Sequence, residues 1–218
     1  MPKDIRIAVV DSGINPTHSH VGEVSGGVSF LNDPAEVEPA WVDKLGHGTA
    51  VAAAIRQHAP EVQLFAVRVF EESFATGIDR VVNGLEWCVE NHMDVVNLSL
   101  ATLKDLNREA LDSVCQRIPI LVAPYDFLGV PAFPGSFPST FGVAGDQTLE
   151  SDAHRFEDTP TPHFLASPYP RSLKSISDAR NFSGPSFATA NLAGLICRIM
   201  ITRGMRDPAV LRSFLIDE

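Results

Sequence analysis

The chain has 218 residues, of which 44% are hydrophobic and 20% charged, a composition typical of a folded globular protein. This length suits one α/β domain with its own core, so we expect a single domain over residues 1–218. The formal net charge of −10 argues against a nucleic-acid partner, because phosphates would be repelled. No apolar run approaches the roughly 20 residues of a membrane-spanning helix, so we expect no membrane partner.

The first residues and the cysteines bear on the compartment. Residues 1–4 lead directly into an apolar run, without the apolar core and cleavage site of a signal peptide, which favours a cytoplasmic protein. Cys88, Cys115 and Cys197 are widely spaced and lie in apolar or helical segments. They predict reduced, buried thiols rather than a disulfide framework or a metal site, and nothing in the sequence implies a cofactor.

Strand-like and helix-like segments alternate along the chain. Short apolar runs predict strands, and longer stretches with apolar residues at helical spacing predict helices. The predicted strands are 5–10, 62–70, 94–100, 118–123 and 141–144, and the predicted helices are 48–57, 78–91, 106–117 and 184–203. A last helix should start at Asp207-Pro208, with Asp as N-cap and Pro in the first turn.

Residues 146–182 are rich in Pro, Ser, Asp and His, and we expect loops there with one strand near 164–166. The alternation elsewhere predicts a three-layer α/β fold. In this arrangement a mostly parallel, doubly wound sheet carries helices on both faces.

Three segments carry side chains of the types that take part in catalysis. The first is a strand of β-branched residues that ends at Asp11, where open α/β sheets place ligands, although an ordinary strand-end turn explains it equally well. The second is His47, which lies between two glycines at the start of a predicted helix. A lone histidine is more often structural, but the flanking glycines leave it little reason to be a core residue.

The third segment is 181–190, in which Ser186 falls at the start of the long apolar helix. Its own backbone N–H and the helix dipole would point toward an oxyanion formed there. The alternative is that Ser183 or Ser186 is simply the N-cap of that helix, a common position for serine.

Together the order and setting of Asp11, His47 and Ser186 resemble those of the subtilase family of serine proteases. The similarity extends over 66–69, 84–100 and 207–215 and is weakest over 146–180. It implies a subtilisin-like fold, here as a minimal catalytic core without a prodomain. It also implies a catalytic triad of these three residues, acting on a peptide or protein substrate.

The resemblance further implies where a substrate lies. The peptide would add as a strand beside Leu98, Ser99, Leu100 and Ala101, with the opposite rim at Phe74-Ala75-Thr76. Side chains stand at positions where many relatives have glycine, which implies narrow specificity.

The main departure from the family is at the oxyanion hole. Relatives place an asparagine after a small-residue strand, whereas this chain has Asp126 there, to act with the Ser186 N–H. A protonated Asp126 would donate a hydrogen bond, an ionised one would weaken or abolish activity, and one turned into a polar network would do neither.

Other departures affect stability and the remaining histidines. In relatives a long loop after the first helix contributes a calcium site. Here only residues 57–61 connect that helix to the next strand, so we expect no calcium site at that place. Larger relatives also have segments that this sequence lacks, so we expect the chain either to fold unaided or to rely on a partner protein or a neighbouring domain. His154 and His163 lie among acids without metal-ligand spacing and are interpreted as solvated loop residues. His18 and His20 are interpreted as structural or rim residues.

Three functions remain open at this point. The sequence favours a cytoplasmic serine endopeptidase with narrow specificity. A pseudoprotease that binds extended peptides is favoured by Asp126. A transamidase or macrocyclase would use the same acyl-enzyme but pass it to an amine.

Overall fold

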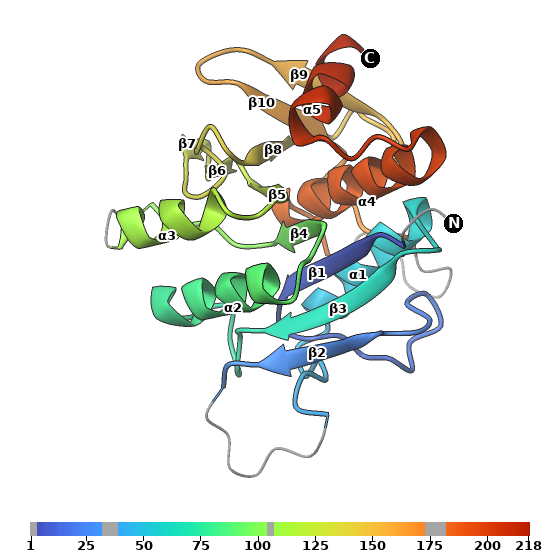
Figure 1. Cartoon of the computed structure of the whole chain (residues 1–218), viewed down its shortest axis with the longest axis vertical. Coiled ribbons are helices and arrows are strands. Elements are labelled where there is room, and N and C mark those ends of the chain that lie inside the picture. The colour runs from blue at the N-terminus through green and yellow to red at the C-terminus, as the bar shows by residue number, and fades with distance from the viewer. Residues whose placement is uncertain (1–3, 32–38, 104–106, 173–181) are drawn as a thin grey trace.

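The computed structural model describes residues 4–31, 39–103, 107–172 and 182–218. Eight strands form one sheet in the order β2-β3-β1-β4-β5-β8-β10-β9, in which every pair is parallel except β10 with β9 (Figure 1). The strands are β1 (Arg6–Asp11), β2 (Gly26–Ser29), β3 (Gln63–Arg68), β4 (Val95–Leu98), β5 (Ile120–Pro124), β8 (Phe141–Gly145), β9 (His154–Glu157) and β10 (His163–Ala166).

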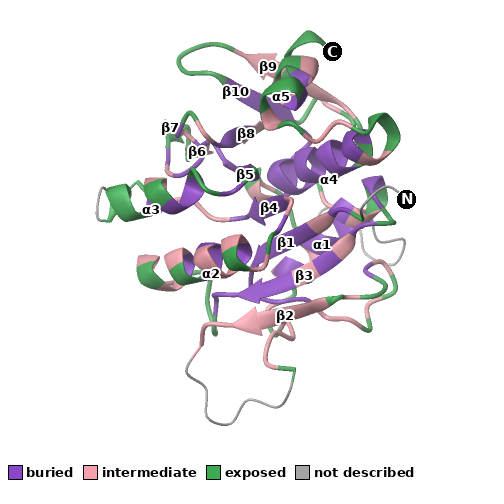
Figure 2. Ribbon diagram, viewed as in Figure 1, coloured by how far each residue is buried: buried purple, intermediate pink, exposed green. Residues whose placement is uncertain are grey.

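Helices cover both faces of the sheet. They are α1 (His47–His58), α2 (Ile78–Glu90), α3 (Arg108–Cys115), α4 (Pro185–Arg203) and α5 (Pro208–Asp217). One buried cluster joins the sheet to α1, α4 and α5, and a second joins its other face to α2 and α3. Figure 2 shows the central strands and α4 buried between these layers. The predicted three-layer, mostly parallel α/β fold is therefore confirmed.

The central strands form where the sequence is apolar on both faces. Residues 7–11 of β1 are all buried, because β1 lies between β3 and β4 with helices above and below. The helix α4 is apolar around most of its circumference for the same reason, and it ends at Gly204, whose φ of +68° suits a residue without a Cβ. Asp207 caps α5 as predicted, accepting from the N–H groups of Ala209 and Val210.

Three sequence expectations were incomplete. In the described part of the region 146–182 there are two strands rather than one, because β9 is an edge strand whose polar residues pair with the predicted strand β10. The edge strand β2 was not predicted from its Gly-Gly-Val-Ser sequence. The predicted helix 106–117 begins at Leu106, which lies outside the described residues, and α3 starts at Arg108.

A short hairpin and three buried cysteines complete the description of the fold. A short hairpin, β6 (Asp126–Phe127) and β7 (Val130–Pro131), follows β5. The cysteines are all buried and unbonded to one another, and burial raises the pKa of the Cys115 thiol to about 12. Within the described ranges, no helix combines the length and apolar character needed to cross a bilayer.

Candidate active site

The candidate site lies where the chain changes direction across the sheet. After β1 the chain forms β2 and β3 on one side of it, and it then crosses to β4 on the other side of β1. Asp11 is the last residue of β1 and is fully buried. Open α/β sheets bind ligands at the carboxyl ends of strands at such a point. The fold therefore places Asp11 at a favoured position for chemistry rather than at an ordinary turn.

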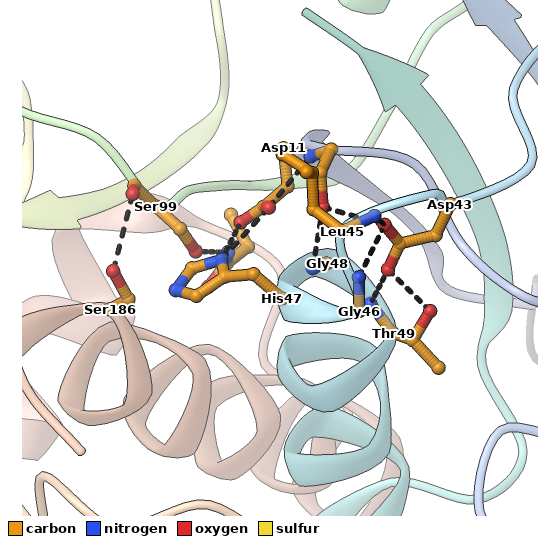
Figure 3. Close-up of polar contacts among 11 residues, drawn as sticks. Asp11, Asp43, Leu45, Gly46, His47, Gly48, Thr49, Ser99 and Ser186 are labelled. Carbon is orange, nitrogen blue, oxygen red and sulfur yellow. Dashed lines mark hydrogen bonds and ion pairs between the residues drawn. The ribbon is translucent and has the colours of Figure 1, made fainter. Parts of the chain in front are cut away.

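His47 and Asp11 are in direct contact (Figure 3). The imidazole Nδ1 lies 2.9 Å from both carboxylate oxygens of Asp11, and the N–H of Ser12 donates to Oδ1 at 2.7 Å. This approach depends on Gly48, because a Cβ there would lie 2.2 Å from the carbonyl oxygen of Gly13. The small residue after the histidine thus lets the start of α1 reach the end of β1.

Asp43 holds the start of α1 in place, a role that the sequence reasoning missed. Its Oδ1 accepts from the Ser12 hydroxyl and from the N–H groups of Leu45 and Gly46, each at 2.9 Å. Its Oδ2 accepts from the N–H and the hydroxyl of Thr49, at 2.9 and 2.6 Å. An Asp shortly before a predicted helix was the available signal.

The surroundings of His47 set its pKa. Burial disfavours the charged imidazolium, but the charge and hydrogen bond of Asp11, with the charge of Asp43, outweigh it and raise the pKa above the usual value. Three aromatic rings pack around the imidazole, with centroids at 5.1 Å (Phe74), 5.9 Å (Phe182) and 5.4 Å (Phe187). Of these three, only Phe74 was among the sequence-predicted site residues.

Ser186 is the second residue of α4, after Pro185. The N-cap is Gly184, with φ of +141° and no side-chain cap, so the alternative that Ser183 or Ser186 caps the helix is wrong. The N–H of Ser186 belongs to the first turn, where a helix leaves backbone donors without internal partners. The fold therefore places the hydroxyl and the backbone N–H of Ser186 together at one helix end.

The hydroxyl of Ser186 donates to the carbonyl oxygen of Ser99 at 3.3 Å. In Figure 3 the imidazole of His47 lies between Asp11 and Ser186. Among the described contacts, the hydroxyl makes no hydrogen bond to His47. A rotation about χ1 would redirect Oγ, and catalytic hydrogen bonds of this kind often tighten only with substrate bound.

Asp126 begins the β6–β7 hairpin directly after Tyr125 and is half-buried. Its Oδ2 accepts from the N–H of Gly129 at 2.7 Å, which closes the hairpin turn. Its side chain also lines a cavity together with Gly184 and Pro185, just before Ser186. One oxygen thus has a structural partner, while the residue remains beside the candidate nucleophile. The oxyanion role of Asp126 stays a prediction.

The sequence-predicted substrate residues fall into two groups. Phe74, Ala75 and Thr76 line a cavity of about 380 Å³ opposite Leu100 and Ala101. The remaining two, Leu98 and Ser99, do not line this cavity. The Leu98 side chain is fully buried in the core and Ser99 contacts Ser186.

The other histidines that the sequence singled out have local partners. The interpretation of His154 and His163 as solvated loop residues is wrong, because they lie in β9 and β10 and His163 is buried. Nε2 of His154 contacts the carbonyl oxygen of Leu215 at 2.9 Å, and His163 stacks on Tyr125 with centroids 3.9 Å apart. His18 and His20 pack edge to face at 5.4 Å. Within the part of the chain that the structure describes, no three His, Cys, Asp or Glu side chains gather as metal ligands would.

Comparisons with known proteins identify a family match and related proteins. The sequence model of the Subtilase family matches residues 2–124. The chain is 32% identical over 156 residues to the minor extracellular protease Epr of Bacillus subtilis (strain 168), covering 65% of this chain. The match spans only 23% of Epr, about a quarter of that relative's length.

A second relative is similar over most of the chain. This is an intracellular serine protease of Paenibacillus polymyxa, 24% identical over 221 residues, with 90% of this chain and 67% of the relative covered. Among solved structures, a cold-adapted subtilisin-like serine proteinase superposes with a TM-score of 0.74 at 24% identity. That match covers 98% of this chain and 81% of the other, and it shows the same fold.

Proposed function

Because the chain belongs to the subtilase family, we propose that it is a serine endopeptidase that cleaves peptide bonds through an acyl-enzyme on Ser186. The observation that carries this proposal is the buried Asp11–His47 pair at the end of β1, with Ser186 at the nearby start of α4. A carboxylate, an imidazole and a hydroxyl from three distant segments are the parts of a serine-protease relay.

Each residue has one task in the proposed reaction. Neutral His47 takes the proton of Ser186 as Oγ attacks the substrate carbonyl carbon, and it later returns that proton to the leaving amine. Asp11 holds Nδ1–H of the imidazole, which fixes the tautomer and stabilises the imidazolium. Water, activated by His47, then cleaves the acyl-enzyme and regenerates the Ser186 hydroxyl.

The substrate would bind along the segment that follows β4. The substrate residues before the scissile bond would pair with the enzyme backbone near Ser99. They would also place a side chain in the cavity between Phe74 and Leu100. That cavity is lined largely by apolar side chains, among them Phe70, Phe133 and Leu111. Such walls accept apolar residues of limited size, which supports a processing enzyme with narrow specificity.

Asp126 is expected to lower the turnover number of the proposed reaction. It stands where relatives have the asparagine whose loss costs about 10²–10³ in kcat. An ionised carboxylate about 3 Å from the oxyanion would add repulsion of up to about 5 kcal/mol at an effective dielectric near 20. We therefore expect turnover below that of relatives with the amide.

The proposed setting is the cytoplasm, with a peptide or protein substrate and one catalytic domain over residues 1–218. Its support is the similarity to the Paenibacillus polymyxa protein described as an intracellular serine protease. A partner protein or further domain belongs to the same proposal, as does the exclusion of nucleic acid and membrane partners.

A second candidate is a pseudoprotease that binds extended peptides without cutting them. Two observations favour it. Asp126 lines a cavity with Pro185, the residue before Ser186, and the Ser186 hydroxyl donates to the carbonyl oxygen of Ser99 instead of to His47. A transamidase would use the same residues and differ only in the acceptor of the acyl group.

A peptide-library digest analysed by mass spectrometry separates these functions. Products that gain one water, formed by the intact protein and absent with Ser186→Ala, support the endopeptidase. Products that lose the leaving segment without gaining water identify transamidation or cyclisation. Intact peptides, retained by folded protein with measurable affinity, identify the binding protein and contradict the proposal.

A further inference from the structure

A second cavity, of about 440 Å³, lies beside Ser186 and has no part in the mechanism above. Its walls are the β6–β7 hairpin, the turn between β9 and β10, and Gly184 and Pro185 just before Ser186. Figure 1 shows the hairpin next to that turn, and the hydroxyls of Tyr125 and Thr161 join them by a hydrogen bond. The apolar cavity described above is lined by different residues, on the side of Phe74 and Leu100.

The charged groups of this cavity are acidic. Asp126 and Glu157 line it, and neither Lys nor Arg is among its lining residues. Glu157 is partly neutralised, because Arg155 Nη2 lies 3.3 Å from its Oε1 and also contacts Asp146. Asp126 has only the backbone N–H of Gly129 on Oδ2, and it enters no ion pair within the described chain. Among the described residues, no cationic side chain therefore compensates its negative charge.

A buried histidine adds an unused acceptor to the wall. His163 is 5% exposed and lines the cavity. Its Nδ1 lies 2.8 Å from the carbonyl oxygen of Thr161 and must carry the hydrogen there, so Nε2 of the neutral ring is an acceptor. Nε2 makes no hydrogen bond within the described residues, and Oε2 of Glu157 lies 3.8 Å from it. The stack on Tyr125 fixes this orientation.

We propose that this cavity is the subsite for a basic side chain, Lys or Arg, on the leaving-group side of the scissile bond. The substrate residues before that bond are assigned to the apolar cavity near Leu100. The substrate residues after the bond therefore continue past Ser186 toward the β6–β7 hairpin. An ammonium or guanidinium there meets Asp126, Glu157 and the His163 acceptor. Prolines at 131, 160, 168 and 185 line the cavity and would pack along its aliphatic stem.

The same contact explains how Asp126 is compatible with catalysis. Alone, its charge opposes the oxyanion that forms on the substrate carbonyl oxygen when Ser186 attacks. A substrate cation bound against Asp126 neutralises that charge while the oxyanion develops, so the basic side chain increases kcat as well as affinity. Asp126 is then a specificity-determining residue, which makes neutral substrates slow.

This inference rests on the proposed function for its kinetic part, so binding and cleavage are measured separately. The substrates are two quenched fluorescent peptides that differ only in lysine or acetyl-lysine at the first position after the scissile bond. Binding is measured on Ser186→Ala by fluorescence anisotropy, and cleavage on the intact enzyme. We expect the lysine peptide to bind about tenfold tighter and to be cleaved with a kcat/KM higher by a larger factor.

The decisive variant is Asp126→Asn. It should reduce the binding preference to within about twofold and raise kcat on the acetyl-lysine peptide. Glu61→Gln removes an equal charge from the exposed loop at the amino end of β3 and should change neither measurement. Equal binding of the two peptides, or a preference that survives Asp126→Asn, overturns the inference. A lysine preference in binding without any cleavage supports the subsite and contradicts the endopeptidase.

Discussion

Replacing Asp43 by asparagine tests whether this residue positions the candidate base or only stabilises the fold. The change keeps the side-chain shape and one carbonyl oxygen, which retains the donors from Ser12, Leu45 and Gly46. The amide NH₂ then replaces Oδ2 and faces the N–H of Thr49, so two donors meet. The Thr49 hydroxyl also loses its acceptor, because an amide nitrogen cannot accept a hydrogen bond.

The size of the effect follows from these two bonds. A hydrogen bond to a charged group contributes about 1.5–3 kcal/mol, and the half-buried site allows some relaxation, so we expect a loss of about 2–4 kcal/mol. For a chain of this size that corresponds to a decrease in Tm of about 5–15 °C. Differential scanning calorimetry measures it. Asp152→Asn, which removes an exposed carboxylate, is the matched control and should leave Tm unchanged.

The pH profile distinguishes positioning from stability alone. The charge of Asp43 helps to raise the pKa of His47, and the neutral imidazole is the base, so kcat/KM should increase with pH through a raised midpoint. Asp43→Asn removes one raising contribution and should move that midpoint to lower pH. A lower Tm with an unchanged midpoint would refute the positioning role, and an unchanged Tm would refute the estimated bond energies.

Two further predictions concern the framework. Arg56→Met should decrease stability by about 2–4 kcal/mol, measured by urea denaturation, because the guanidinium donates to the carbonyl oxygens of Val21, Glu23, Pro60 and Val62; equal stability would show that water replaces it. Gly27→Ala should cost about 1–3 kcal/mol, since its Cβ would lie 2.5 Å from the carbonyl oxygen of Ala66. Gly77→Ala meets no atom within 4 Å and is the control; similar losses in both variants would contradict the packing argument.

The sequence predicted those parts of the fold in which local pattern and burial agree. The run that forms β1 is apolar on both faces, and the α4 sequence is apolar around its axis, so each predicts its own element. The edge strands β2 and β9 were missed because an edge strand needs little apolar surface. Their pairing is set by β3 and β10, which are distant in sequence.

The site shows the same division. Asp11, His47 and Ser186 stand in distinctive local settings, whereas the function of Asp43 depends on contacts with Ser12 and Thr49 that only the fold creates. The acidic cavity is similar, because Asp126 and Glu157 come together through the packing of two hairpins. Neither segment carries a sequence motif that predicts its contact with the other.

The relay itself is tested most directly by the rate at which a fluorophosphonate labels Ser186, followed by intact-protein mass spectrometry across pH. We expect one adduct on Ser186, a rate that increases with pH through a midpoint above the ordinary histidine value, and loss of labelling in His47→Ala. Labelling of folded protein that is independent of His47, or none at all in folded protein, would contradict the account.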